Sequence, residues 1–223
     1  MTLIYSGDTW TIQSFVSGSE NNAYLVTCLQ TESSVIIDTP DSPHELIDAA
    51  SRTDVRAVLI THNHMDHLQG FGDVVRKFDV PVGIGKGDAH SVDERAGRLL
   101  DVSQDTLITY GGISMRAVST PGHTPGSTCF VLPSESPGAT PHVFTGDTLF
   151  PGGPGKSRSA ETFDLIVESI GERLMTLPAD TVVLPGHGRS TTIAESKAEY
   201  DSFVAMPRKP GLYGDVTWSG AGA

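Results

Sequence analysis

The chain has 223 residues, of which 38% are hydrophobic and 19% charged, and its formal net charge is −12. This length and composition fit a single globular domain with an ordinary core. The acidic balance excludes a binding surface for nucleic acid or an anionic membrane, because phosphate groups require clustered Lys and Arg. No stretch approaches the roughly 18 apolar residues of a membrane span, and the first residues lack a basic start followed by an apolar run. We therefore expect a cytoplasmic protein that binds neither membranes nor nucleic acids.

The first quarter of the chain has the pattern of a β-meander that ends in a helix. Short runs rich in Val, Ile, Leu, Thr and aromatic residues alternate with turn-forming segments such as SGSENN. After Ser42 as the N-cap, with Pro43 at the first helical position, apolar residues recur at helical spacing. The predicted elements are strands at 3–6, 9–16, 23–30 and 33–38 and a helix at 42–52.

The rest of the chain continues with a strand, a polar loop rich in histidine, and further strands and helices. One of these helices carries an apolar stripe interrupted by Gly171, a defect worth about 1 kcal/mol relative to Ala. The predicted strands lie at 56–61, 81–84, 105–109, 112–119, 127–132, 142–146 and 181–185. The predicted helices lie at 68–78, within 88–101, at 161–175 and at 193–203.

Strands followed by helices therefore occur twice, in two halves of similar pattern. Two packed sheets with helices outside, an α/β fold with four layers in the order α/β/β/α, would bury each amphipathic element once. We expect one domain over 1–206, followed by a Gly- and Pro-rich tail at 207–223 to which the sequence assigns no structure. Cys28 and Cys129 each lie in an apolar run, which favours buried, reduced thiols over a disulfide.

The segment THNHMDH at 61–67 places three histidines and a carboxylate within six residues at the end of an apolar strand. A single loop histidine is commonly solvated, but surface polarity does not explain the spacing H-x-H-x-D-H. His62 and His64 can face one metal ion, while Asp66 and His67 turn toward a second. The segment is therefore a candidate metal site.

Other candidate ligands also follow apolar strands directly. RAVLIT leads to His62, SMRAVSTPG to His123, HVFTG to Asp147 and TVVLPG to His187. Strand ends in packed sheets can meet at one edge, where the loops beyond them form a common pocket. The remaining histidines form no second cluster and are interpreted as structural or surface residues: His44, His90 and His142.

Asp38 ends the strand SVIID in a similar position, and two interpretations of it stay open. Its carboxylate can accept a hydrogen bond from the ring nitrogen that a ligand histidine does not use for the metal. Equally, it can be a turn-forming Asp that precedes Thr-Pro.

These residues resemble the metallo-β-lactamase superfamily, whose signature H-x-H-x-D-H is matched in full and is followed by His, Asp and His ligands in the same order. The resemblance covers roughly 22–199 and implies the four-layered α/β/β/α metallo-β-lactamase sandwich, with 1–206 as its catalytic domain. It also implies two divalent metal ions, zinc in the first place, although iron and manganese suit the same ligands. By this resemblance His62, His64 and His123 bind the first ion, Asp66, His67 and His187 bind the second, and Asp147 bridges both.

Within the superfamily, the segments GHTPGS, GDTLF and LPGHG are similar to glyoxalase II, which cleaves S-acyl glutathione thioesters. Lys156 falls where a lysine of that family contacts the glutathione carboxylate, and a solvated surface lysine is the equal alternative. Arg158 stands where the family has an aromatic residue. Glyoxalase II carries an added C-terminal helical domain, whereas 36 residues follow His187 here. These departures leave the thiol carrier open.

The resemblance implies a hydrolase that cleaves a small-molecule thioester through a metal-bound hydroxide. Two ions that share a water lower its pKa toward about 7, and Asp66 is expected to orient this nucleophile or to transfer its proton. No general acid is evident outside the ligand set, which favours a thiolate leaving group, whose conjugate acid has a pKa of about 8.5, over an amide nitrogen. The alternatives are a persulfide dioxygenase with a single iron, a lactone or ester hydrolase, and non-catalytic metal binding. The sequence does not indicate the oligomeric state.

Overall fold

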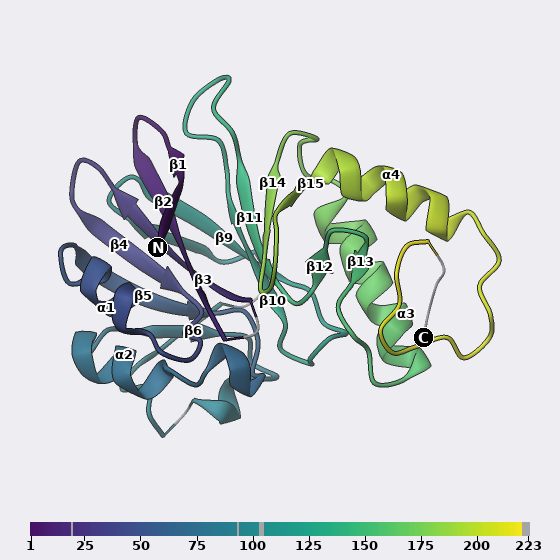
Figure 1. The fold of residues 1–223 in the computed structure, drawn as a ribbon, viewed down its shortest axis with the longest axis horizontal. Helices are drawn as coiled ribbons and strands as arrows, with labels where there is room; N and C mark the ends of the chain where they lie inside the picture. Colours follow the sequence, from purple (N-terminus) through teal and green to yellow (C-terminus); the bar gives the residue numbers. More distant parts are fainter. Residues whose placement is uncertain (19, 93, 103–104, 220–223) are drawn as a thin grey trace.

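The computed structural model describes residues 1–18, 20–92, 94–102 and 105–219. Two β-sheets pack face to face in the middle of the molecule, and helices cover the outer face of each (Figure 1). This arrangement confirms the predicted four-layered α/β/β/α sandwich. A separate two-stranded sheet is formed by β12 (Leu149–Phe150) and β13 (Gly153–Pro154), which the sequence pattern did not predict.

The first sheet contains seven strands whose order across the sheet is their order in the chain. They are β1 (Thr2–Ser6), β2 (Trp10–Ser17), β3 (Asn21–Cys28), β4 (Ser33–Ile37), β5 (Asp54–Ile60), β6 (Val82–Ile84) and β7 (Leu99–Leu100). Pairing is antiparallel from β1 to β4 and parallel from β4 to β7. Side chains alternate between the faces of a strand, so Ala23 and Leu25 pack under the helices while Tyr24 and Val26 face the second sheet.

The second sheet contains six strands. In their order across the sheet they are β15 (Thr191–Thr192), β14 (Val182–Pro185), β11 (His142–Gly146), β10 (Thr128–Leu132), β9 (Ile113–Ser119) and β8 (Leu107–Tyr110). Only β11 and β14 pair in parallel, and the other neighbours are antiparallel. The parallel pair brings the ends of β11 and β14 to the same edge of the sheet.

The helices lie in pairs outside the sheets, with α1 (His44–Ala50) and α2 (Phe71–Phe78) on the first sheet and α3 (Ala160–Ser169) and α4 (Ile193–Val204) on the second (Figure 1). The side chain of Ser159 accepts a hydrogen bond from the Thr162 amide and caps α3. Thr192 caps α4 in the same way through the Glu195 amide. Among the described residues, no helix is both long and apolar enough to cross a membrane.

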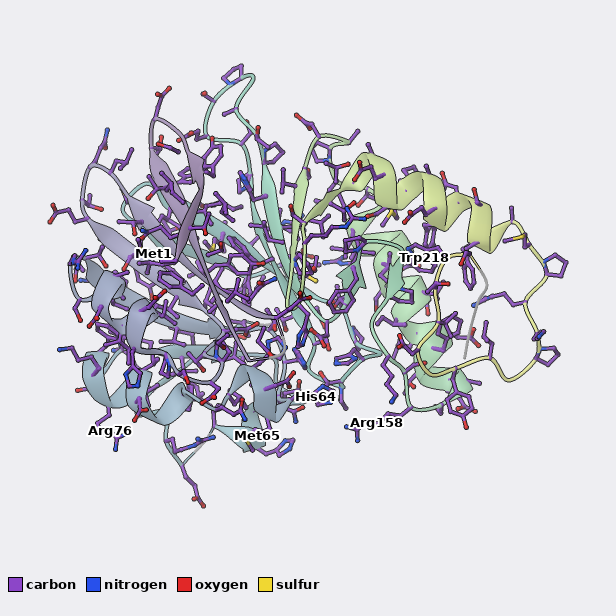
Figure 2. The ribbon with its side chains drawn as sticks, in the orientation of Figure 1. Met1, His64, Met65, Arg76, Arg158 and Trp218 are labelled. Atoms are coloured by element: carbon purple, nitrogen blue, oxygen red, sulfur yellow. The ribbon has the colours of Figure 1, made fainter. Side chains whose placement is uncertain are left out.

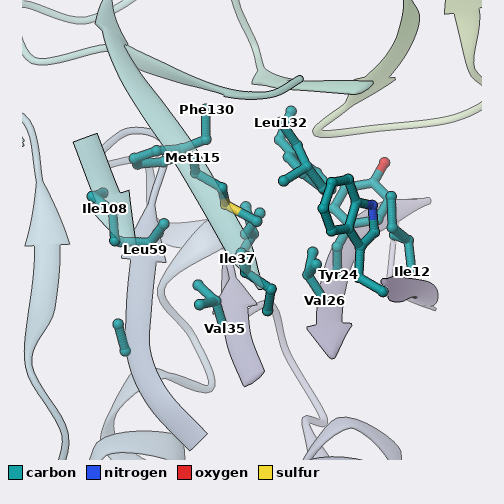
Figure 3. Close-up of a cluster of buried hydrophobic side chains, with 14 of the residues drawn as sticks. Ile12, Tyr24, Val26, Val35, Ile37, Leu59, Ile108, Met115, Phe130 and Leu132 are labelled. Carbon is teal, nitrogen blue, oxygen red and sulfur yellow. The ribbon is translucent and has the colours of Figure 1, made fainter. Parts of the chain in front are cut away.

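Three apolar layers hold the sandwich together. Between the sheets, Tyr24, Ile37 and Leu59 of the first sheet share a cluster with Met115 and Phe130 of the second (Figure 3). A second cluster joins the first sheet to α1 and α2, and a third joins the second sheet to α3 and α4. Both cysteines are buried free thiols, as predicted.

The helix predicted at 42–52 begins later than the sequence indicated. Ser42 has a left-handed φ of 54° and does not cap the helix, and Pro43 occupies the N-cap position before α1. The helix predicted at 68–78 is also shorter, because residues 68–70 form a turn between a 3-10 turn, η1 (Met65–His67), and α2. Instead of the α-helix predicted within 88–101, the described residues form a 3-10 turn, η2 (Ala89–Ser91), and strand β7.

The helix predicted at 161–175 changes character at its C-terminal end. It becomes a π-helical turn, η3 (Ile170–Leu174), directly after α3. A Cβ atom at Gly171 would overlap the Tyr200 hydroxyl and lie 2.9 Å from Tyr200 Cζ. Gly171 therefore allows α4 to approach this turn closely, and it is not simply a helical defect.

The tail packs on the helices of the second sheet. Val216 and Trp218 are 2% exposed and belong to the third apolar cluster, and the Trp218 amide donates to the Gly152 carbonyl at 2.7 Å. Tyr200 of α4 contacts the Trp218 ring edge-on. The aromatic residues Tyr200 and Trp218 are visible in the sequence, but no periodic pattern in the tail predicts that it packs on α4. The domain boundary at 206 stays a prediction.

Candidate metal centre

Four loops that follow strands carry the candidate ligands. The first candidate ligand on each loop is His62 after β5, His123 after β9, Asp147 after β11 and His187 after β14. Backbone hydrogen bonds tie these loops together: the Gly186 amide donates to the Gly146 carbonyl, and the Asn22 amide donates to the Gly186 carbonyl, each at 2.8 Å. The structure therefore brings the strand ends to a common edge, as the sequence suggested.

The first group consists of His62, His64, His123 and Asp147, whose ligand atoms lie within 4.8 Å of one another. His123 Nε2 lies 2.9 Å from His64 Nδ1 and 3.5 Å from Asp147 Oδ2. The side chain of His62 is buried, and its ring packs against the rings of His64 and His123.

The second group consists of Asp66, His67 and His187, with the same spread of ligand atoms. His187 Nε2 lies 3.3 Å from His67 Nε2 and 3.2 Å from Asp66 Oδ2. Asp147 Oδ1 lies 3.4 Å from His67 Nε2, and Asp147 Oδ2 lies 3.6 Å from His187 Nε2. The Asp147 carboxylate thus contacts ligands of both groups.

Two buried atoms of these groups have no hydrogen-bond partner: His62 Nε2 and Asp147 Oδ1. A buried polar atom without a partner is costly in a folded protein. Imidazole nitrogens and carboxylate oxygens that converge in this way are a donor set for divalent ions such as zinc, iron or manganese. The cluster and the orphaned atoms therefore fit divalent metal binding, and they do not discriminate between these metals.

Hydrogen bonds on the outer side of the rings orient three of the histidines toward the cluster. His123 Nδ1 donates to the Lys156 carbonyl at 2.8 Å, and His67 Nδ1 donates to Asp38 Oδ2 at 2.9 Å. His62 Nδ1 lies 3.1 Å from the Thr61 hydroxyl, which itself donates to Asp38. These contacts direct the Nε2 atom of each ring inward, as supporting hydrogen bonds do at metal sites.

The charge states of the cluster also suit a cation. Burial lowers the pKa of His62, His64 and His123, so these rings are neutral, the form that binds metal. Burial also acts against a charge on His67, but the carboxylates of Asp38 and Asp147 outweigh it and raise the pKa of this ring to about 10. Metal binding to His67 would therefore release a proton.

Asp147 is ionised despite its burial, because the protonated ring of His67 beside it holds the pKa of its carboxyl well below the usual range. Its side chain is only 13% exposed. A buried carboxylate in contact with both groups is suited to neutralise charge shared between two ions.

Asp38 combines the two interpretations that the sequence left open. It adopts a left-handed φ of 58°, which Asp tolerates in turns, and its carboxylate accepts hydrogen bonds from the Thr61 amide, the Thr61 hydroxyl and His67. The turn conformation aims the buried carboxylate at the candidate ligands.

Lys156 and Arg158 both have exposed side chains, and both residues contact histidines of the first group. The Lys156 carbonyl holds His123, a backbone contact that its side-chain chemistry could not predict. Arg158 Nη2 lies 3.1 Å from His64 Nε2, and Figure 2 shows the two side chains near each other at one side of the molecule. The guanidinium of Arg158 thus lies beside the metal centre, next to His64.

Sequence reasoning missed two supporting residues, Asn21 and Asp88. Asn21 Nδ2 donates to Asp66 Oδ2 at 3.0 Å and to the Asp66 carbonyl at 3.3 Å. Asp88 is fully buried and contacts the loops that carry the first group. The only sequence signal for Asn21 was a polar pair at the start of an apolar strand, and no sequence pattern pointed to Asp88.

The three histidines set aside by the sequence analysis, His44, His90 and His142, belong to neither group. His44 begins α1, and His90 lies in η2. His142 is buried against the Tyr5 ring, with centroids 4.5 Å apart, and burial lowers its pKa to about 4. Their interpretation as structural or surface residues agrees with these positions.

Residues 17–187 match the family described as the metallo-beta-lactamase superfamily. The chain belongs to this superfamily. A hydroxyacylglutathione hydrolase-like protein from Gallus gallus is 35% identical over 171 residues, which are 75% of this chain and 58% of that protein. A Schizosaccharomyces pombe protein named "Probable hydroxyacylglutathione hydrolase glo2" is 32% identical over 196 residues, 84% of this chain and 70% of its own length.

Two solved structures share the fold of this chain. A metallo-beta-lactamase from Staphylococcus aureus matches with a TM-score of 0.76 and 25% identity, over 86% of this chain and 62% of that one. ETHE1 from Myxococcus xanthus matches with a TM-score of 0.73 and 23% identity, over 88% of this chain and 85% of that one. At this identity the second match shows the fold alone.

Proposed function

We propose that this protein is a metal-dependent hydrolase of the glyoxalase II type, which cleaves S-acyl thioesters of a small thiol. The observation that carries the proposal is the pair of His and Asp groups joined by the carboxylate of Asp147. Relatives named as hydroxyacylglutathione hydrolases support thioesters over other substrates.

The two groups would hold two divalent ions, with Asp147 contacting both. Bound ions would polarise the acyl carbonyl and lower the pKa of a water molecule, so that no side-chain nucleophile is needed. We propose zinc as the metal in the first place, because imidazole and carboxylate are ordinary zinc ligands, with iron and manganese as alternatives.

Asp66 is proposed to orient the attacking water and to accept its proton. Its side chain is 45% exposed, so it can reach both solvent and substrate, while its Oδ2 faces His187. The Asn21 amide holds this carboxylate by a hydrogen bond and limits its rotation. A positioned carboxylate of this kind typically contributes a factor of about 10²–10⁴ to a proton transfer.

Lys156 and Arg158 are proposed to bind an anionic part of the substrate. Both side chains are exposed on the segment that contacts His123 and His64, whereas the chain as a whole carries a net charge of −12. An overall acidic surface repels anions, so a local pair of cations is a selective feature. Arg158 also offers a planar fork that suits a carboxylate. A thioester of a carboxylate-bearing thiol fits this site.

The second candidate function is persulfide oxidation at a single iron, in line with the fold shared with ETHE1. The first group alone has enough ligands for one ion. The intact second group of Asp66, His67 and His187 favours two ions and hydrolysis. A lactone or other ester would use the same centre and is distinguished by substrate.

A panel of substrates tests the proposal directly. Protein loaded with zinc, iron or manganese is given S-lactoylglutathione, a coenzyme A thioester, a lactone and glutathione persulfide, while thiol release and oxygen uptake are followed. We expect thiol release without oxygen uptake, and a higher KM for the thioester in Lys156→Ala and Arg158→Ala. Oxygen uptake with the persulfide, or turnover confined to the lactone, would contradict the thioesterase proposal.

A further inference from the structure

A buried carboxylate, Asp88, lies between the two loops that carry the histidines of the first group. Its side chain is fully buried at the start of η2, and none of its atoms belongs to the candidate ligand set. Asp88 Oδ2 accepts hydrogen bonds from the Asn63 amide at 3.1 Å and from the Thr124 hydroxyl at 2.6 Å. Asp88 Oδ1 accepts a hydrogen bond from the Gly126 amide at 2.9 Å.

The donors are placed where they control the ligand loops. Asn63 separates His62 from His64, and Thr124 directly follows His123. The three bonds therefore join one loop to the other through a single side chain. A shift of either loop would break at least one of these bonds.

Glycines allow the Asp88 loop to reach this position. A Cβ on Gly126 would lie 2.5 Å from the Asp88 amide, and a Cβ on Gly87 would lie 2.7 Å from the Pro125 carbonyl carbon. A Cβ on Gly85 would overlap the Gly126 carbonyl oxygen. The backbones of 85–88 and 124–126 are thus in direct contact, which leaves Asp88 little freedom to move.

Burial of a carboxylate is costly unless its oxygens are fully hydrogen-bonded. Here the partners are two backbone amides and a hydroxyl of the ligand loops. Such a group contributes little to an apolar core but fixes the geometry of the backbone that it joins. We infer that Asp88 is a positioning residue that sets the metal affinity of the group formed by His62, His64 and His123.

This inference rests on the proposed metal centre and is independent of the identity of the substrate. The informative variant is Asp88→Asn, which keeps the shape of the side chain. The amide has one acceptor oxygen, so its NH₂ group must face either the Gly126 amide or the Asn63 amide. The backbone amide of one ligand loop then loses the oxygen that accepts its hydrogen bond and faces the NH₂ group of the new side chain instead.

Cobalt affinity of each group tests the inference when the other group is disabled. His187→Ala leaves the first group intact, and His123→Ala leaves the second group intact. Asp88→Asn is introduced into each background, and Co²⁺ binding is titrated by visible absorbance in competition with a chelator. We expect affinity to fall by about 10–100-fold in the His187→Ala background, as for other residues that support metal ligands. In the His123→Ala background it should change less than threefold.

Equal losses in the two backgrounds, or no loss in the first, would overturn the inference, because a merely structural residue does not discriminate between the groups. A control variant, Asp79→Asn, makes the same chemical change at an exposed site and should leave both affinities unchanged. If Asp88→Asn does not fold, Thr124→Val carries the test. It removes one of the three bonds and should weaken the first group by about threefold to tenfold, whereas unchanged affinity would contradict the inference.

If the parent His187→Ala protein binds no cobalt while it remains folded, the proposed metal centre fails, and the role of Asp88 fails with it. Loss of thioesterase activity alone would not bear on Asp88. The two failures are therefore distinguishable.

Discussion

Replacement of Gly171 by Ala is expected to destabilise the protein, although the same change in most helices is stabilising. Gly→Ala at a compatible helical position raises the free energy of unfolding by about 0.4–1 kcal/mol. At Gly171 the added Cβ would overlap the Tyr200 hydroxyl and lie 2.9 Å from Tyr200 Cζ. The Tyr200 ring is itself packed edge-on against Trp218, so it cannot move away freely.

Overpacking of this kind typically costs about 1–3 kcal/mol. Set against the helical gain, the expected net effect is a decrease of the order of 1 kcal/mol in the free energy of unfolding. For a chain of this length, that corresponds to a fall in Tm of about 2–4 °C. Urea unfolding followed by circular dichroism, with equal metal content in all samples, measures the difference.

Gly72 provides a matched control in α2, because a Cβ there would have no atom within 4 Å. Gly72→Ala should raise the free energy of unfolding by a few tenths to about 1 kcal/mol. Tyr200→Phe, which removes the clashing hydroxyl, should reduce the cost of Gly171→Ala when the two are combined. A stabilising Gly171→Ala, similar to Gly72→Ala, would refute the close approach of α4 to the π-helical turn.

Three further predictions concern hydrogen bonds and protonation. Asp38→Asn keeps a residue that tolerates the left-handed φ but removes the carboxylate that raises the pKa of His67 to about 10. NMR titration of the metal-free protein should therefore find the pKa of His67 more than one unit lower, and an unchanged value would count against the contact. Asn21→Ala releases the carboxylate of Asp66, so we expect kcat to fall about 10-fold while KM stays within twofold, and an unchanged kcat would disprove a positioning role. Burial lowers the pKa of His142 to about 4 from its ordinary 6.5, so its contribution to stability is complete above pH 6.5 and is lost as the pH falls toward 4. Urea unfolding of chelator-treated protein should show that His142→Gln removes a slope of about 1.4 kcal/mol per pH unit in this window, and parallel pH profiles would contradict the prediction.

The part of the fold that the sequence predicted is the part that depends on local periodicity. The continuous apolar run of β3 indicated a strand buried on both faces, and the helical stripe of α3 indicated its buried face; the four-layered sandwich followed from the order of these elements. The candidate ligands were also predictable, because each follows an apolar strand and histidine is rare enough for its spacing to be informative. The residues of THNHMDH alone supply His62, His64, Asp66 and His67.

What the sequence did not predict depends on contacts between distant segments. The close packing of the π-helical turn against α4 joins Gly171 to Tyr200, which are far apart in the chain. The support of His123 comes from the backbone carbonyl of Lys156, which any residue could supply. Asp88 has no neighbouring motif, and its importance is apparent only when the loops that it joins are seen together.

The most direct test of the account compares Asp147→Ala with the wild-type protein for both metal content and thiol release from S-lactoylglutathione. Asp147 contacts ligands of both groups. Its loss should therefore weaken metal binding at both groups and abolish turnover. Asp164→Ala, at an exposed position on α3, is the control and should behave as the wild type. We expect two bound ions and efficient thiol release in the wild type, with both reduced in Asp147→Ala. Full metal content and full activity in that variant would contradict a catalytic metal centre joined by Asp147.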